Sequence, residues 1–186
     1  MNPQHRARLA ATLTATALVG GLGTSLPAQA ALPAGDGVTT TALGRTSPNK
    51  IAYDYFRAKG LTPAQSAGIV GNLMQESGSP INPRARQKGG PGMGIAQWSR
   101  GARWNQLTRY AAKTKRSPYA LNTQLDFIWV ELNGSEKRAL GKLRASRSLP
   151  AATASFSRHY ERCAPRWCHN TKRTANAQRV LSAYAR

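Results

Sequence analysis

Acidic residues are scarce in this chain: seven Asp and Glu stand against 27 Lys and Arg in 186 residues. The formal net charge is +20 at pH 7, and the basic residues are spread from Arg84 to Arg186 instead of forming one run. A charge of this size implies an anionic partner or surface. The phosphate-rich polymers of a bacterial wall and nucleic acid both fit, and composition does not decide between them.

Long hydrophobic runs are lacking too, because no stretch reaches the roughly 20 apolar residues of a membrane-spanning helix. Residues 1–30 hold Arg6 and Arg8, an apolar stretch from about 9 to 22, and the small-residue sequence Ala28-Gln29-Ala30. This order is typical of a secretory signal peptide. We therefore expect cleavage after Ala30 and a secreted protein, extracellular or associated with the cell wall. Its net charge would be +18, because the signal holds two basic residues and no acidic ones.

Cysteine is also rare, with only Cys163 and Cys168 present. Two close cysteines in an oxidising compartment favour a disulfide over two free thiols. His159 and His169 flank them, so a zinc site is the alternative, but four ligands packed this tightly do not match a usual zinc spacing. We expect a disulfide, no metal and no cofactor.

Helical patterns are what the chain does have, from residue 47 onward. Residues 31–46 are small and polar and predict a flexible leader, so residues 47–186 form the predicted domain. A capping box at Thr62 to Gln65, with Pro63 at the first helical position, starts the second helix. Residues 79–98 predict loops with a small hairpin. Helices are expected at 48–59, 63–77, 102–112, 121–132, 136–145, 150–161 and 173–185.

Glu76 stands out among the few acids. It follows Ile69 and Leu73 at helical spacing, so its carboxyl group falls on the apolar face of the second helix. It also lies in the last turn, where the helix dipole disfavours an anion. Burial and the dipole both favour the protonated form, and such an acid can protonate a leaving oxygen. The alternative is a glutamate whose stem packs while its head reaches water or an arginine.

The loop "GGPGMGIAQW" follows this helix and ends in Gln97 and Trp98. Glycine lets a backbone come close to a ligand, and an amide and an indole suit a sugar-binding cleft, one for hydrogen bonds and the other as a stacking plane. The loop lacks the G-K-[ST] of a phosphate-binding loop. The alternative is a structural turn with Trp98 in the core.

The runs "AGIVGNLMQESGSPINPRA" and "GGPGMGIAQWSRGAR" resemble the phage tail lysozyme family, which belongs with goose-type lysozymes and lytic transglycosylases in a lysozyme-like group. The resemblance continues through "QLDFIWVEL" and "FSRHYERC" and covers about 50–186. It implies an α+β, mostly α, lysozyme-like fold with a small loop or β lobe after the catalytic helix. It also implies a peptidoglycan-cleaving enzyme, with Glu76 as its catalytic acid. The substrate-binding residues that it implies are Ser77, Gly94, Ile95, Gln97 and Trp98.

A second carboxylate is usual in glycosidases. Asp54, Asp126 and Glu131 are the candidates, although Glu131, with Gln124 seven residues before it, is better interpreted as structural. Without a second acid, the substrate's own N-acetyl or 6-hydroxyl group would assist Glu76 and give an anhydro end. With one, an activated water would give hydrolysis, which we favour for the bond between N-acetylmuramic acid and N-acetylglucosamine.

The competing class is a non-enzymatic cationic protein that binds the cell wall or nucleic acid. It rests on the charge and on Trp104, Trp129 and Trp167, but these lie in helical patterns that favour core packing. A role that depends on positive charge also does not explain why Glu76 lies on the apolar face of a helix. We therefore expect peptidoglycan and anionic wall polymers as partners, no nucleic acid, and a monomer.

Overall fold

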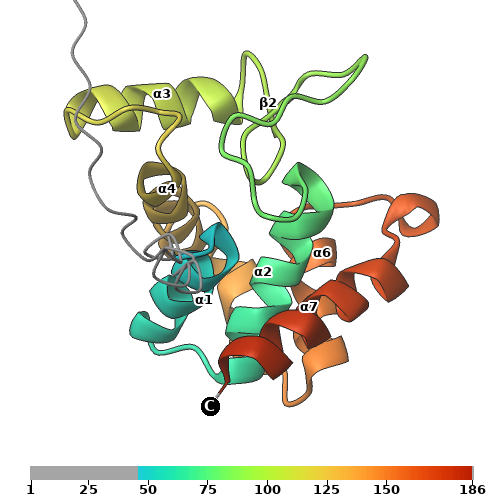
Figure 1. Ribbon diagram of the computed structural model, residues 1–186. Coiled ribbons are helices and arrows are strands. Elements are labelled where there is room, and N and C mark those ends of the chain that lie inside the picture. The colour runs from blue at the N-terminus through green and yellow to red at the C-terminus, as the bar shows by residue number, and fades with distance from the viewer. Residues whose placement is uncertain (1–45, 186) are drawn as a thin grey trace, which may run out of the picture. The chain divides into compact units, whose positions relative to one another are not determined.

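The computed structural model describes residues 46–185 and is mostly helical with one small sheet (Figure 1). This confirms the α+β, mostly α, class. The expected signal peptide, and the leader up to residue 45, lie outside the described residues. No helix within residues 46–185 has the length and apolar character needed to cross a membrane. The elements run in the order α1 (Pro48–Ala58), α2 (Pro63–Ser77), β1 (Gly92–Met93), β2 (Trp98–Ser99), α3 (Arg103–Lys113), α4 (Leu121–Asn133), α5 (Lys137–Arg144), α6 (Leu149–His159), the 3-10 turn η1 (Pro165–Trp167) and α7 (Asn170–Tyr184).

Local signals fix where α2 begins and ends. The Thr62 side chain accepts a hydrogen bond from the Gln65 backbone N–H at 3.2 Å, and the Gln65 side chain accepts one from the Thr62 N–H at 3.0 Å. This is the reciprocal capping box expected from the sequence. Gly78, at φ 102°, ends the helix in a conformation that glycine adopts readily.

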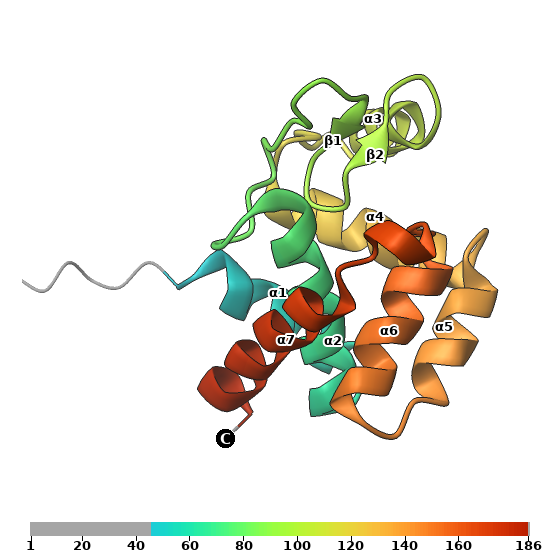
Figure 2. The ribbon, with the colours of Figure 1, turned by 90° about the vertical axis from the view of Figure 1, so that its right-hand side faces the viewer.

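Helix α2 is the central element and packs against α1, α6 and α7 (Figure 2). Its residues from Gln65 to Met74 are all buried. Gly71 permits the close approach of α7, because a Cβ at this position would lie 2.6 Å from the Ala177 nitrogen and from the Arg173 carbonyl oxygen. Because the first three turns of α2 are buried on all sides, packing fixes the position of its last turn, which holds Glu76.

A small lobe follows α2. Strands β1 and β2 form an antiparallel hairpin in which Gly92 pairs with Ser99 and Met93 with Trp98. In Figure 2 the hairpin and α3 lie together above the C-terminal end of α2. Gln124 of α4 holds the lobe in place, since its side chain accepts from the Ile95 N–H at 2.9 Å and donates to the carbonyls of Pro83 and Pro118.

Two features differ from the sequence-based expectations. Trp167 was expected to pack in a helical core, but it lies in η1 and is 65% exposed. The last helix begins at Asn170, three residues earlier than expected, directly after this turn. The chain leaves the helical conformation after α6, with Arg162 at φ 54°, and the Cys163–Cys168 disulfide then closes the short segment that contains Trp167.

Candidate active site

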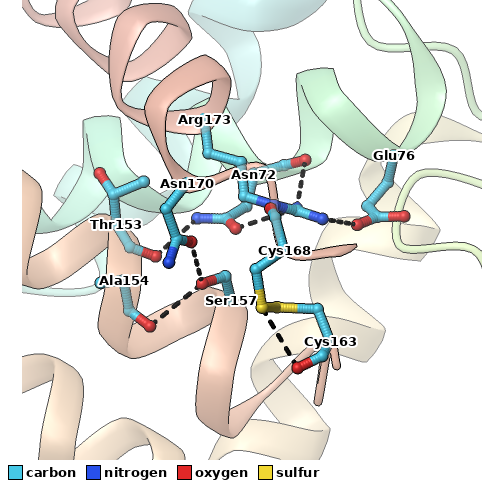
Figure 3. The surroundings of a disulfide bond; sticks show 9 residues. All are labelled: Asn72, Glu76, Thr153, Ala154, Ser157, Cys163, Cys168, Asn170 and Arg173. Carbon is cyan, nitrogen blue, oxygen red and sulfur yellow. Dashed lines mark hydrogen bonds and ion pairs between the residues drawn. A yellow bond between two sulfur atoms is a disulfide. The ribbon is translucent and has the colours of Figure 1, made fainter. Parts of the chain in front are cut away.

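Glu76 occupies the last turn of α2 and keeps 20% of its side chain exposed. Its Oε1 accepts a hydrogen bond from Nη2 of Arg173, on α7, at 2.5 Å. The guanidinium is itself 4% exposed, and it also donates to Asn72 Oδ1 at 3.0 Å and to the Cys168 carbonyl at 2.6 Å (Figure 3). The Glu76 carboxyl group is therefore partly buried, as expected from its place on the apolar face of the helix. It also bonds to an arginine, as expected for the alternative, a glutamate whose head reaches water or an arginine.

Two polar hollows flank Glu76. The larger, of about 640 Å³, is lined by Ser77 and the loop residues 82–87. The smaller, of about 300 Å³, is lined by Arg103, Arg173 and the segment around Cys163 to Trp167. Glu76 and Gln97 line both hollows, so the two adjoin at these side chains. A chain of sugar units lying across both hollows would pass over the Glu76 carboxyl group.

Gln97 sits in the hairpin turn with φ 47°, a left-handed conformation that is uncommon outside glycine. Its side-chain nitrogen donates to the Gly94 carbonyl at 2.9 Å, which fixes the amide at the junction of the hollows. Backbone strain of this kind gathers at functional sites. Gln97 therefore lies where the two hollows meet, and its role as a ligand-binding amide stays a prediction.

The other predicted substrate-binding residues divide between the site and the core. Ser77 lines the larger hollow, and its hydroxyl accepts from the Asn82 N–H at 3.2 Å, which holds the turn after α2. Gly94 and Ile95 are buried in the hairpin turn. They shape the loop through their backbone.

Trp98 lies in the core, which was the alternative left open by the sequence. It is 1% exposed and packs edge-on against Phe127. Its indole N–H donates to Glu131 Oε2 at 3.0 Å. Trp98 is among the residues that line the smaller hollow, but a ring buried to this degree presents no open face for a sugar to stack on.

The three candidates for a second acid are all engaged elsewhere. Asp54 is 52% exposed and pairs with Lys50 at 2.6 Å. Asp126 accepts from the Tyr55 hydroxyl and pairs with Arg116. Glu131 is buried and accepts from Trp98, Arg103 and Tyr160, which agrees with the structural role expected for it. None of the three lines either hollow in the part of the chain that the structure describes.

Glu161, which no pattern in the sequence indicated, lines the smaller hollow together with Glu76. Its Oε1 is buried and has no hydrogen-bond partner among the described residues. Burial, and then the charge of Glu76, raise the pKa of the Glu161 carboxyl well above its usual 4.5, against the opposing effect of Arg103 and Arg173. "FSRHYERC" lies within the stretch that resembled the family, but no spacing in it indicates that Glu161 reaches α2.

The predicted disulfide is confirmed, since Cys163 and Cys168 are bonded to each other. This removes both sulfurs as zinc ligands. The bond closes a short segment, the disulfide loop (residues 163–168), which contains η1 and carries Trp167 to the edge of the smaller hollow.

A mostly helical domain, whose central helix ends in a glutamate beside polar hollows and under a small β lobe, has the architecture of lysozyme-like proteins. The model of the phage tail lysozyme family matches residues 48–184, and the chain belongs to that family. No curated protein matches the chain. Membership places the domain among lytic enzymes that act on peptidoglycan, as the resemblance implied.

Proposed function

We propose that the protein is a secreted enzyme that hydrolyses the β-1,4 bond between N-acetylmuramic acid and N-acetylglucosamine, with Glu76 as general acid. The observation that supports this most strongly is the position of Glu76 at the junction of the two hollows. Of the six acids among residues 46–185, only Glu76 lines both. A glycan crossing from one hollow to the other would bring a bridging oxygen to it.

The proton of the Glu76 carboxyl group moves to the bridging oxygen as the bond from C1 to that oxygen breaks. Because Asp54, Asp126 and Glu131 line neither hollow, the substrate's own N-acetyl oxygen takes the place of a second acid and bonds to C1 as the leaving oxygen departs. Water then displaces the acetyl oxygen from C1, and the ionised Glu76 takes the proton that this water releases, which restores the acid. Arg173, already at hydrogen-bonding distance, stabilises the carboxylate between the two steps. General acid catalysis of this kind contributes about 10²- to 10⁴-fold in rate.

The larger hollow suits an acidic, amide-rich glycan. Arg84 and Arg86 line it and give it positive charge, while Gln87 and Gln97 supply amides. N-acetylmuramic acid carries a free carboxylate on its lactyl group where no peptide is attached, and on the peptide where one is; a guanidinium binds such anions well. The charge of the secreted form, +18 without residues 1–30, also favours accumulation on a wall rich in phosphate polymers.

Secretion rests on the signal-peptide pattern of residues 1–30. The non-enzymatic alternative, a cationic binder of the wall, rests on the same charge, so charge does not separate the two. The Glu76 site does, because a protein that only adheres has no need of a partly buried acid between two hollows.

Mass spectrometry of the fragments released from purified peptidoglycan tests the proposal. We expect fragments with reducing N-acetylmuramic acid ends. Anhydro ends would show that the enzyme is a transglycosylase and not a hydrolase, because they form when the 6-hydroxyl group attacks C1 in place of water. An absence of released glycan would contradict the enzymatic proposal and leave the wall-binding class.

A further inference from the structure

Trp167 is one of two large hydrophobic side chains that the described part of the chain exposes, at 65%; the other is Val130 of α4, at 47%. Tryptophan has a large apolar face, and exposing it to water is unfavourable, whereas a ligand that covers the face removes this cost. Val130 lines neither hollow beside Glu76, whereas Trp167 lines the smaller one. The position of Trp167 therefore calls for a ligand.

The smaller hollow has the chemistry of a sugar site. Around Trp167 it presents charged and polar side chains, among them Glu76, Gln97, Ser99 and Arg103. A pyranose ring has an apolar face of C–H groups and a rim of hydroxyl and amide groups. An indole can cover the face while the polar side chains bind the rim.

The disulfide loop is held at a fixed place relative to Glu76. Figure 3 shows Arg173 between the two: one guanidinium donates to the Cys168 carbonyl at 2.6 Å and to Glu76 Oε1 at 2.5 Å. The disulfide from Cys168 to Cys163 closes the loop that carries Trp167. A rigid loop loses little entropy on binding, so its aromatic ring is suited to act as a platform.

We propose that the disulfide loop forms a glycan-binding subsite, in which Trp167 stacks on a sugar ring of an N-acetylated β-1,4 glycan. The smaller hollow meets the larger one at Glu76, so the subsite would hold the strand beyond the bond that is cleaved. The proposal rests on the proposed function. The glycan is the ligand we assign to the subsite, because the disulfide loop lines the same hollow as Glu76 and this hollow is lined by polar groups.

Calorimetric titration with N-acetylglucosamine oligomers tests the subsite in the Glu76→Gln background, where no cleavage occurs. Adding Trp167→Ala should weaken affinity about tenfold, in line with the loss of one aromatic stacking contact. Trp167→Tyr should recover most of the affinity, since it restores an aromatic face. Val130→Ala, the matched change at the other exposed side chain, should leave affinity unchanged. Equal affinity of the Trp167→Ala variant and its parent would overturn the proposal.

Two further measurements make the test specific. The Cys163→Ser/Cys168→Ser variant should lose affinity as Trp167→Ala does while keeping its helical circular dichroism, because the loop no longer fixes the ring. Unchanged affinity there would overturn the role given to the disulfide. If Trp167 is needed for binding to anionic phospholipid vesicles and the protein does not bind the glycan, the ligand of the disulfide loop is a membrane surface and the glycan proposal is wrong.

Failure of this subsite is distinguishable from failure of the proposed function. If the wild-type protein releases glycan from peptidoglycan and Trp167→Ala changes neither KM nor oligomer affinity, only the subsite is wrong. We expect the variant to raise KM about tenfold and to change kcat less. If the wild-type protein binds oligomers through Trp167 but releases nothing, the subsite stands and the enzymatic function fails.

Discussion

Arg173 and Glu76 lie 97 residues apart in the sequence, yet Arg173 Nη2 donates to Glu76 Oε1 at 2.5 Å. The pair joins α7 to the last turn of α2, and the same guanidinium is bonded to Asn72, one turn earlier on α2. The close packing of α7 on α2 therefore places the Arg173 guanidinium beside Glu76. Gly71 makes that packing possible.

Gly71→Ala tests this dependence. The added Cβ would lie 2.6 Å from backbone atoms of Arg173 and Ala177, which cannot rotate away as a side chain can. We expect a loss of roughly 1–3 kcal/mol in the free energy of unfolding, typical of overpacking, and a loss of activity as Arg173 shifts. Chemical denaturation and a peptidoglycan turbidity assay measure the two effects.

Gly141→Ala on α5 is the matched control, because nothing lies within 4 Å of the Cβ it would add. Alanine is the better helix former by about 1 kcal/mol, so this variant should be slightly more stable and fully active. If both variants behave alike, close packing at Gly71 does not govern the site.

Glu161→Gln tests the buried carboxyl group of the smaller hollow. Its pKa in the folded protein is raised well above the ordinary 4.5, so the folded state keeps a proton that the unfolded chain loses. The folded state then binds more protons, and stability falls as pH rises above about 4.5 toward the raised pKa. Glutamine does not ionise, so the variant should lack this fall. We expect the variant to gain stability over the wild-type protein as pH rises from 4 to 7.

Thermal unfolding across that pH range provides the measurement. Asp54→Asn, which changes an exposed carboxylate paired with Lys50, should shift stability little, because surface ion pairs contribute at most about 1 kcal/mol. Parallel pH curves for Glu161→Gln and the wild-type protein would show that Glu161 loses its proton in the folded state as readily as in the unfolded one.

Wall binding should depend on salt if the positive charge serves adsorption. The screening length is about 8 Å at physiological ionic strength and about 3 Å at 1 M. Sedimentation of the Glu76→Gln variant with intact cell walls should therefore show binding that weakens steeply as salt is added. Walls stripped of their anionic polymers should show a weaker dependence. If the affinity for walls does not change with salt concentration, adsorption depends on contacts with the glycan and not on the positive charge.

Much of the fold followed from local signals in the sequence. The capping box at Thr62 and the helical spacing of apolar residues depend on neighbours a few positions apart, and the structure has these helices within a few residues of where they were expected. Glu76 was also found in this way, since its place on the apolar face of α2 is a matter of spacing.

The partners of Glu76 were not predictable in the same way. Arg173 and Glu161 reach the site because α6 and α7 pack on α2, and no short-range spacing encodes that contact. The tryptophans show the same limit. Trp98 is buried with its N–H bonded to Glu131, and Trp167 is exposed on a loop that a disulfide closes. Both depend on contacts that the pattern of apolar residues does not contain.

The most direct test of the account is the rate of glycan release from purified peptidoglycan by the Glu76→Gln variant. Glutamine keeps an oxygen that can accept from Arg173 but has no proton to give, so the fold and glycan binding should persist while the rate falls 10²-fold or more. Glu136→Gln, which changes another arginine-paired glutamate outside both hollows, should retain the wild-type rate. A Glu76→Gln variant that releases glycan as fast as the wild-type protein would contradict the role of Glu76 as general acid.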